Sequence, residues 1–373
     1  MLVTYIIISS LLLISAGVYL YFYFMRTAVF WNKGKKIKRI NLITAILACI
    51  SSICSINLFG LGALIILHIV GIALFIELLN LMYLFITRFR YTKKTIWNNI
   101  YRCGLIPFII TGIVLSYGYF SMENVKETDY TIYTEKAIRQ QGYRIAMIAD
   151  LHFGTTMDEE KLEKYAKEIE EKKPDMVVLC GDIVDQRTTL SQMEGAAKVL
   201  GNIKSRYGTF YVYGNHDKSF GSNGNFSEQQ LRNNLTNNGI TVLEDEIKKV
   251  NGEFTIIGRK DKGFSSEHNR KTSEELLNNA DKQNFLLLLD HQPSGLKENS
   301  TSGMDLQLSG HTHGGQIWPV GLLNGTFKIG ELNYGYKKID KSQFIVSSGI
   351  AGWGYPIRTG SKSEYVIIDI FHK

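Results

Sequence analysis

Acidic residues are almost absent from the first third of this sequence of 373 residues. Residues 1–121 contain one acid, Glu77, and eleven Lys and Arg, so this part carries a charge of 11 − 1 = +10. Because the whole chain has a net charge of +7, residues 122–373 carry 7 − 10 = −3. A mildly acidic region lacks the basic surface on which binding to nucleic acid depends, so we expect no nucleic-acid partner.

Cysteine is also scarce, with four residues in the chain. Cys49, Cys54 and Cys103 lie in or beside apolar segments, which leaves Cys180 alone in the rest of the sequence. A single cysteine can form neither a disulfide framework nor a CxxC metal site. Both are therefore excluded for residues 122–373.

Charge is missing altogether from residues 2–25. At about 1.5 Å per residue, a helix of this length reaches about 36 Å, enough to cross a hydrocarbon core of about 30 Å. The segment lacks the positive start and the A-x-A-like site of a cleaved signal peptide, so we expect it to be retained.

Residues 40–87 are too long for one span and are interrupted at NLFGLG. The sequence predicts an all-α transmembrane region of about four helices over residues 1–121, with spans at about 2–25, 40–58, 61–87 and 103–121.

The basic residues of this region lie in two loops, RTAVFWNKGKKIKR and RFRYTKKTIWNNIYR. Cytoplasmic loops carry an excess of Lys and Arg, so both loops are expected on the cytoplasmic side, with two crossings between them. This predicts a multi-pass protein of the cell membrane whose C-terminal domain lies on the extracellular face. His68 and Glu77 fall within the third span, where they could mark an ion path or, as we favour, be neutral or paired packing residues.

The remaining sequence has the pattern of an α/β domain. We expect a linker at 122–142 and a domain at 143–373, in which short β-branched strands alternate with helical stretches at 158–173, 190–205 and 272–283. Five of the strands run directly into potential metal ligands. The clusters are ADLH (Asp150, His152), CGDIVD (Asp182, Asp185), YGNHD (Asn215, His216, Asp217), DHQP (His291) and SGHTHGGQ (His311, His313).

Strand ends are where open α/β sheets place their functional sites. A single histidine at a strand end is more often structural than a ligand, but five such clusters in succession favour a metal site over coincidence. Because side chains alternate along an extended segment, His311 and His313 point the same way, and each can contact one cation of a pair. The neighbouring glycines allow tight turns or close approach to a bound phosphate.

The order D-x-H, G-D-x-x-D, G-N-H-D, H-x-P and G-H-x-H resembles the calcineurin-like metallophosphoesterases, over about residues 143–371. The extended form GHTHGGQ resembles their membrane-associated bacterial branch, typified by YkuE and YaeI. The resemblance implies an α/β fold, a four-layer α/β/β/α sandwich, with a dinuclear metal centre. It also implies that Asp150, His152 and His313 hold one metal, that Asn215, His291 and His311 hold the other, and that Asp182 bridges them.

Mixed imidazole, carboxylate and amide ligands suit Mn, Fe or Zn better than Mg or Ca. The resemblance implies that His216 acts on the substrate and not on a metal. Two such cations can supply a bridging hydroxide for attack, His216 is placed to be the general acid, and Asp217 could orient its ring. Arg358, in GIAGWGYPIRTG beside Trp353 and Tyr355, could bind a substrate phosphate or simply pack. Asp185 and Gln316 could support the ligands or cap local turns.

These features predict a membrane-anchored phosphoesterase. Its substrate is expected to be a phosphodiester or pyrophosphate, from a lipid-linked or envelope molecule, since anchoring raises the enzyme's effective concentration at the membrane. The alternatives are a catalytically silent metal-binding sensor or scaffold, and a cytosolic-facing enzyme acting on nucleotides, which would require an odd number of spans.

Overall fold

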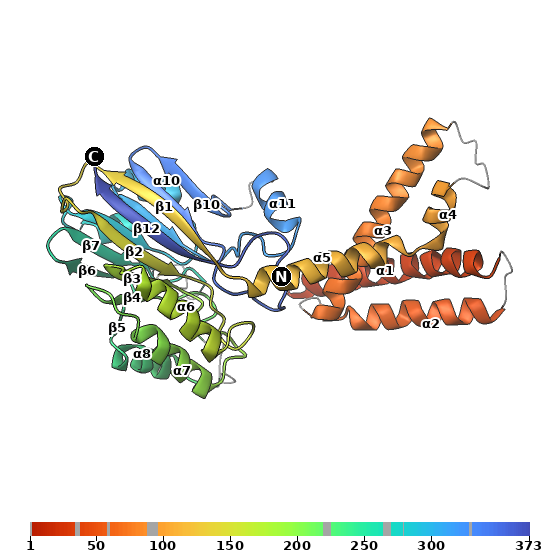
Figure 1. The fold of residues 1–373 in the computed structure, drawn as a ribbon, viewed down its shortest axis with the longest axis horizontal. Helices are drawn as coiled ribbons and strands as arrows, with labels where there is room; N and C mark the ends of the chain where they lie inside the picture. The colour runs from red at the N-terminus through yellow and green to blue at the C-terminus, as the bar shows by residue number, and fades with distance from the viewer. Residues whose placement is uncertain are drawn as a thin grey trace. The chain divides into compact units, whose positions relative to one another are not determined.

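The computed structural model describes residues 2–33, 38–57, 60–87, 96–218, 225–263, 270–278, 280–327 and 330–373. The chain divides into two compact units, an N-terminal unit, Met1–Tyr117, and a C-terminal unit, Gly118–Lys373 (Figure 1). Residues 34–37 and 88–95, which hold much of the basic charge of the two predicted cytoplasmic loops, lie outside the described residues.

The N-terminal unit is built from apolar helices. They are α1 (Leu2–Trp31), α2 (Lys38–Cys54), α3 (Leu61–Ile86), α4 (Ile96–Cys103) and the start of α5 (Ile106–Glu123). Among the described residues, three helical segments are long and apolar enough to cross a membrane: Leu13–Trp31, Leu61–Ile86 and Ile106–Glu123. Helix α2 has 17 residues and a length of about 25 Å, so its crossing stays a prediction.

Glu77, the one acid of the N-terminal unit, is paired. Its carboxylate accepts hydrogen bonds from the Arg26 guanidinium on α1 and from the Tyr101 hydroxyl on α4. A paired carboxylate costs far less inside an apolar environment than an isolated one. The contacts favour a packing role for Glu77 over a place in an ion path.

The C-terminal unit contains two six-stranded sheets. The first has the order β1-β12-β2-β3-β4-β5 and the second the order β10-β11-β9-β8-β7-β6. The strands of the first sheet are β1 (Lys126–Thr134), β12 (Glu364–His372), β2 (Tyr143–Ile148), β3 (Met176–Cys180), β4 (Thr209–Val212) and β5 (Ile240–Val242). Those of the second are β10 (Gly335–Ile339), β11 (Ser342–Val346), β9 (Leu306–Ser309), β8 (Phe285–Leu289), β7 (Phe254–Gly258) and β6 (Glu246–Val250).

Parallel pairing positions the site. Strands β2 to β5 run parallel in the first sheet, and β7, β8, β9 and β11 run parallel in the second. The carboxyl ends of parallel neighbours share one edge of a sheet, so the loops that follow them lie side by side. All five predicted ligand clusters follow strands of these two parallel sets.

Three buried apolar clusters hold the layers together. One lies between the two sheets and includes Val178 and Phe210 of the first and Phe254 and Leu287 of the second. A second lies between the first sheet and helices α6 (Glu159–Glu171), α7 (Leu190–Gly201) and α8 (Glu228–Asn237). The third joins the outer face of the second sheet to α9 (Ser273–Asn278) and α10 (Leu296–Thr301). Helices therefore cover the outer face of each sheet.

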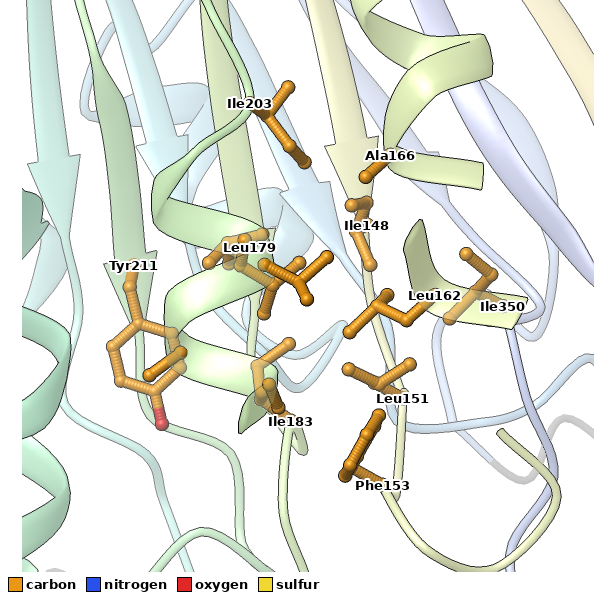
Figure 2. Packing of buried hydrophobic residues seen from close by; sticks show 14 of the residues in the cluster. Ile148, Leu151, Phe153, Leu162, Ala166, Leu179, Ile183, Ile203, Tyr211 and Ile350 are labelled. Atoms are coloured by element: carbon orange, nitrogen blue, oxygen red, sulfur yellow. The ribbon is translucent and has the colours of Figure 1, made fainter. Parts of the chain in front are cut away.

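The helices follow local signals in the sequence. In α6, Leu162, Tyr165, Ala166 and Ile169 repeat at helical spacing and are buried, and the Asp158 carboxylate caps the helix by accepting from the Lys161 N–H at 2.9 Å. Figure 2 shows Leu162 and Ala166 beside Ile148 and Leu179 of the sheet. The predicted helices 158–173, 190–205 and 272–283 are confirmed, although α7 and α9 end four and five residues early.

The segment 122–142, expected to be a linker, contains an edge strand of the first sheet. Strand β1 pairs in parallel with β12 from Lys126, opposite Glu364, to Thr134, opposite His372. The sequence KETDYTIYT reads as a linker because its exposed positions are polar, but Ile132 is fully buried between the sheets. The linker interpretation is therefore wrong for residues 126–134.

Replacing Ile132 with Ala tests whether β1 belongs to the folded unit. We expect the free energy of unfolding to fall by about 2–5 kcal/mol, because the substitution leaves a cavity between the sheets. Denaturation of the full chain in detergent, followed by circular dichroism, measures the change. Thr131→Ala on the exposed face of the same strand is the matched control and should shift stability by less than about 0.5 kcal/mol. Equal stability of both variants would restore the linker interpretation.

Candidate metal centre

Loops from both sheets bring the predicted ligands together at one edge. Six of the seven form two groups, and within each group the ligand atoms lie within 4.8 Å of one another. The first group is Asp150, His152 and His313, and the second is Asp182, His291 and His311. The seventh predicted ligand, Asn215, has its side-chain oxygen 2.7 Å from Nδ1 of His311.

Asp182 lies between the two groups. Its Oδ2 atom is 3.1 Å from Nε2 of His291 in the second group and 3.8 Å from Nε2 of His152 in the first. All three side chains are almost completely buried. One carboxylate can therefore contact cations held by either group.

The ligands sit on unusual backbone. Five of them have positive φ angles, which residues other than glycine rarely adopt: Asp150 at 54°, His152 at 40°, Asp182 at 52°, His311 at 74° and His313 at 51°. Such conformations cost on the order of 1–3 kcal/mol each and persist where the surroundings enforce them. Clustering of this backbone at one edge marks the edge as a functional site.

Apolar residues between the ligands anchor these loops. Leu151 and Phe153 alternate with the ligands after β2, and Ile183 follows Asp182. All three are buried in the cluster beneath α6 and α7, where Figure 2 shows them side by side. The His152 N–H also donates to the Asp182 carbonyl at 3.0 Å. The two loops are thus fixed to the core and to each other.

Several buried imidazole nitrogens of the candidate ligands have no hydrogen-bond partner. Nδ1 of His291 donates to the Cys180 carbonyl at 2.7 Å, which leaves the lone pair on Nε2, and this buried atom has no partner. Nε2 of His152 lies 3.2 Å from Nε2 of His313, and the Nδ1 atoms of both rings have no partner. A backbone carbonyl that fixes the tautomer is typical of metal-binding histidine. The donor set therefore fits a pair of cations.

The charges at this edge perturb one another. Burial raises the pKa of Asp150 to about 6, and burial together with His291 lowers the pKa of His311 to about 4. For Asp182, burial acts to raise the pKa, but His291 and His152 lower it overall. An ionised carboxylate buried among imidazoles is an environment that a divalent cation stabilises.

His216 lies beside the ligands but contacts other groups. Its backbone N–H donates to Oδ1 of Asp182 at 2.7 Å, and its ring centroid is 5.2 Å from that of His152 and 5.3 Å from that of Trp353. Nδ1 of the ring is 3.0–3.1 Å from the side-chain amide of Gln186. Sequence reasoning missed Gln186. Its place directly after Asp185 was the one available signal, and glutamine is too common in loops to stand out.

The predicted pairing of Asp217 with the His216 ring is wrong. The Asp217 carboxylate is buried and accepts hydrogen bonds from four backbone N–H groups, those of Gly214 (2.6 Å), Asp182 (2.7 Å), Ile183 (2.8 Å) and Val184 (3.0 Å). The Asp217 carboxylate points into the loop that follows β3, so it accepts its hydrogen bonds from backbone N–H groups rather than from the His216 ring. Asp217 holds the Asp182 loop in place and does not reach the reacting groups.

Of the two alternatives for Arg358, binding a substrate phosphate or packing, the structure favours packing. The side chain is fully buried, and its guanidinium donates to the carbonyls of His313 (3.2 Å), Ser348 (2.6 Å) and Lys362 (3.1 Å), among others. Burial lowers its pKa to about 10. Arg358 instead fixes the backbone that carries His313.

Gln316 and Asp185 support the site. The Gln316 amide donates to the carbonyls of Trp353 and Ile357 at 3.1 Å each, and its oxygen accepts from the Trp353 N–H at 2.9 Å. Asp185 has an oxygen 3.7 Å from Nδ1 of His152 and accepts from the Arg187 N–H at 2.7 Å. Gln316 links two loops, and Asp185 both caps a turn and lies next to a ligand.

Replacing Asp217 with Asn distinguishes the observed role from the predicted one. Asn turns an NH2 group toward two of the four N–H donors, so we expect a loss of at least about 1–3 kcal/mol of stability and lower metal content. Unfolding and elemental analysis of the purified chain measure both. Asp281→Asn, which changes an exposed carboxylate that accepts one N–H, is the control. Unchanged stability with an altered pH–rate profile would instead support a pair with His216.

The arrangement agrees with comparisons to known proteins. The family model of the calcineurin-like phosphoesterases matches residues 143–315. An uncharacterized metallophosphoesterase of Aquifex aeolicus is 32% identical over 68% of this chain and 95% of its own length, and one of Helicobacter pylori is 30% identical over 73% of each chain. A transmembrane protein with a metallophosphoesterase domain from Danio rerio is 28% identical over 77% of this chain and 67% of its own. The chain belongs to the calcineurin-like phosphoesterase family, whose members use a dinuclear metal centre to hydrolyse phosphoester bonds.

Proposed function

We propose that the C-terminal unit hydrolyses a phosphodiester or pyrophosphate of a lipid-linked or envelope molecule. The observation that carries this proposal is the position of Asp182 between two groups of candidate ligands, 3.1 Å from His291 and 3.8 Å from His152. Such a shared carboxylate suits two cations close together, which is the arrangement that phosphoryl transfer requires.

Each cation has a set of ligands of its own. Asp150, His152 and His313 would hold one, and Asn215, His291 and His311 would hold the other, with Asp182 between the two groups. Imidazole, carboxylate and amide together favour Mn, Fe or Zn. Such a pair supplies the positive charge that stabilises the attacking and leaving oxygens and lowers the pKa of water.

His216 is the candidate general acid for the leaving oxygen. Its ring lies between His152 and Trp353, and Gln186 is within hydrogen-bond distance of Nδ1, so Nε2 remains available to a substrate. Burial lowers the pKa of His216 overall, although Asp182 and Asp185 act to raise it. The negative charge of a bound phosphoester favours the protonated ring, which then delivers its proton to the departing oxygen.

The His216→Ala variant tests this role. We expect kcat to fall by about 10²–10⁴-fold on an alkyl phosphodiester and much less on bis-p-nitrophenyl phosphate, because p-nitrophenolate leaves without a proton. Two metal ions per chain should remain bound, as measured by elemental analysis. Asp182→Ala should lose both metal and activity.

His372→Ala is the matched control for these variants. This exposed histidine contacts the Lys136 carbonyl, which lies just after β1. The variant should therefore equal the unmodified protein in activity and metal content. Equal losses on both substrates for His216→Ala would rule out proton donation. Activity that survives in Asp182→Ala would overturn the two-cation mechanism.

We further propose that α1, α2, α3 and α5 all cross the membrane, which places the C-terminal unit on the outer face of the cell membrane. Two basic loops flank the α2–α3 segment, and the positive-inside rule requires an even number of crossings between them. The support for α2 as a span is its apolar sequence, since its 17 residues are at the short end of the range for spanning helices.

Protease treatment of intact cells tests this topology. An epitope tag placed after Lys373 should be digested without permeabilising the cells, because four crossings return the chain to the outer side. A tag on a cytosolic protein in the same cells is the control and should survive. Protection of the C-terminal tag would mean an odd number of crossings, with α2 lying on the membrane surface.

A further inference from the structure

One helix of the C-terminal unit has no buried face. Helix α11 (Val320–Thr326) follows the GHTHGGQ segment, and none of its residues is buried. The apolar side chains of this helix and its flanks are 43% to 69% exposed: Trp318, Val320, Leu322, Leu323 and Phe327. We refer to these five residues as the α11 patch. Five large apolar residues exposed together mark an interaction surface.

The chemistry of this stretch fits a lipid surface. Residues 306–330 contain no Asp or Glu, and their one Lys or Arg is Lys328. Aromatic residues at both ends of a short apolar helix, without acidic neighbours, are typical of segments that lie in the headgroup region of a bilayer.

The α11 patch is attached to the part of the unit where the chain leaves its last membrane span. The candidate span Ile106–Glu123 ends within the C-terminal unit. Its Gly118 carbonyl accepts from the Arg358 N–H at 2.9 Å. A Cβ on Gly118 would lie 2.6 Å from Thr359, so the two segments are in close contact.

The same segment holds the start of α11. The Trp318 N–H donates to the Thr359 hydroxyl at 3.0 Å, and the Thr359 and Gly360 N–H groups both donate to the Gln316 carbonyl at 2.9 Å. The end of a membrane span and the α11 patch are therefore fixed to one short piece of chain. A surface held this close to the end of a span lies at the membrane.

We propose that the α11 patch inserts into the surface of the phospholipid bilayer that anchors the chain. Gln316, which precedes the patch, binds the loop that carries Trp353, and the Trp353 ring lies 5.3 Å from that of His216. Insertion then places the candidate active site next to the headgroups. The insertion itself does not depend on the proposed reaction and can be measured without turnover.

Fluorescence of the full chain in liposomes tests the proposal. Cys49, Cys54 and Cys103 are replaced by Ser, while Cys180 stays because it is fully buried and burial raises the pKa of its thiol. A nitrobenzoxadiazole label is placed at Leu322→Cys, in vesicles of phosphatidylcholine and phosphatidylglycerol with doxyl groups on the acyl chains. We expect blue-shifted emission that the doxyl lipids quench several-fold more strongly than at a control position.

The control is Tyr133→Cys on β1. Tyr133 is 56% exposed and pairs with Phe371 near the C-terminus, at the end of the unit opposite α11 (Figure 1). Phe327→Cys is a second test position if the first variant does not fold. Quenching at Leu322 or Phe327 no stronger than at Tyr133 would overturn the proposal. A blue shift without lipid quenching would also overturn it, because another protein surface would then cover the patch.

Discussion

The Asp182 carboxylate is the contact on which the rest of the site depends, because it joins ligands from two sheets. Asp182 follows β3 of the first sheet, whereas His291, 3.1 Å away, follows β8 of the second. Its own position is set by Asp217, which accepts three consecutive N–H groups starting at Asp182. One buried carboxylate thus fixes the loop of another, and that second carboxylate links the two groups of ligands.

The sequence identified residues that the structure brings together at one edge, because each of them follows a buried strand. Parallel strands end at a common edge, so a ligand type repeated after successive strands identifies a shared site without knowledge of the third dimension. Asp150, His152, His311 and His313 follow this logic, and the structure gathers them at one edge. The positive φ angles at these residues could not be predicted, because they result from the packing of neighbours such as Leu151 and Phe153.

The sequence failed where a side chain turns toward backbone. Asp217 and Arg358 lie in or near conspicuous motifs, which suggests a role in the reaction. In the structure, however, Asp217 accepts from backbone N–H groups and Arg358 donates to backbone carbonyls. A sequence does not reveal which backbone groups lack partners, so a buried charge that satisfies them is indistinguishable from a charge that faces a substrate. The sequence also failed to predict strand β1, for a related reason. Its burial is limited to one face at its end, where Ile132 is covered by the second sheet.

The connection between α5 and the first strand of the C-terminal unit is short. Helix α5 ends at Glu123 and β1 begins at Lys126, so Asn124 and Val125 alone separate them. The last turn of α5 is held to the rest of the C-terminal unit by hydrogen bonds that include those from Lys161 to Glu123 at 2.6 Å and from the Ser363 hydroxyl to the Met122 carbonyl at 3.0 Å. A flexible linker of many residues would let a domain sample a wide volume. The described residues at this junction contain no such linker, since two residues separate α5 from β1.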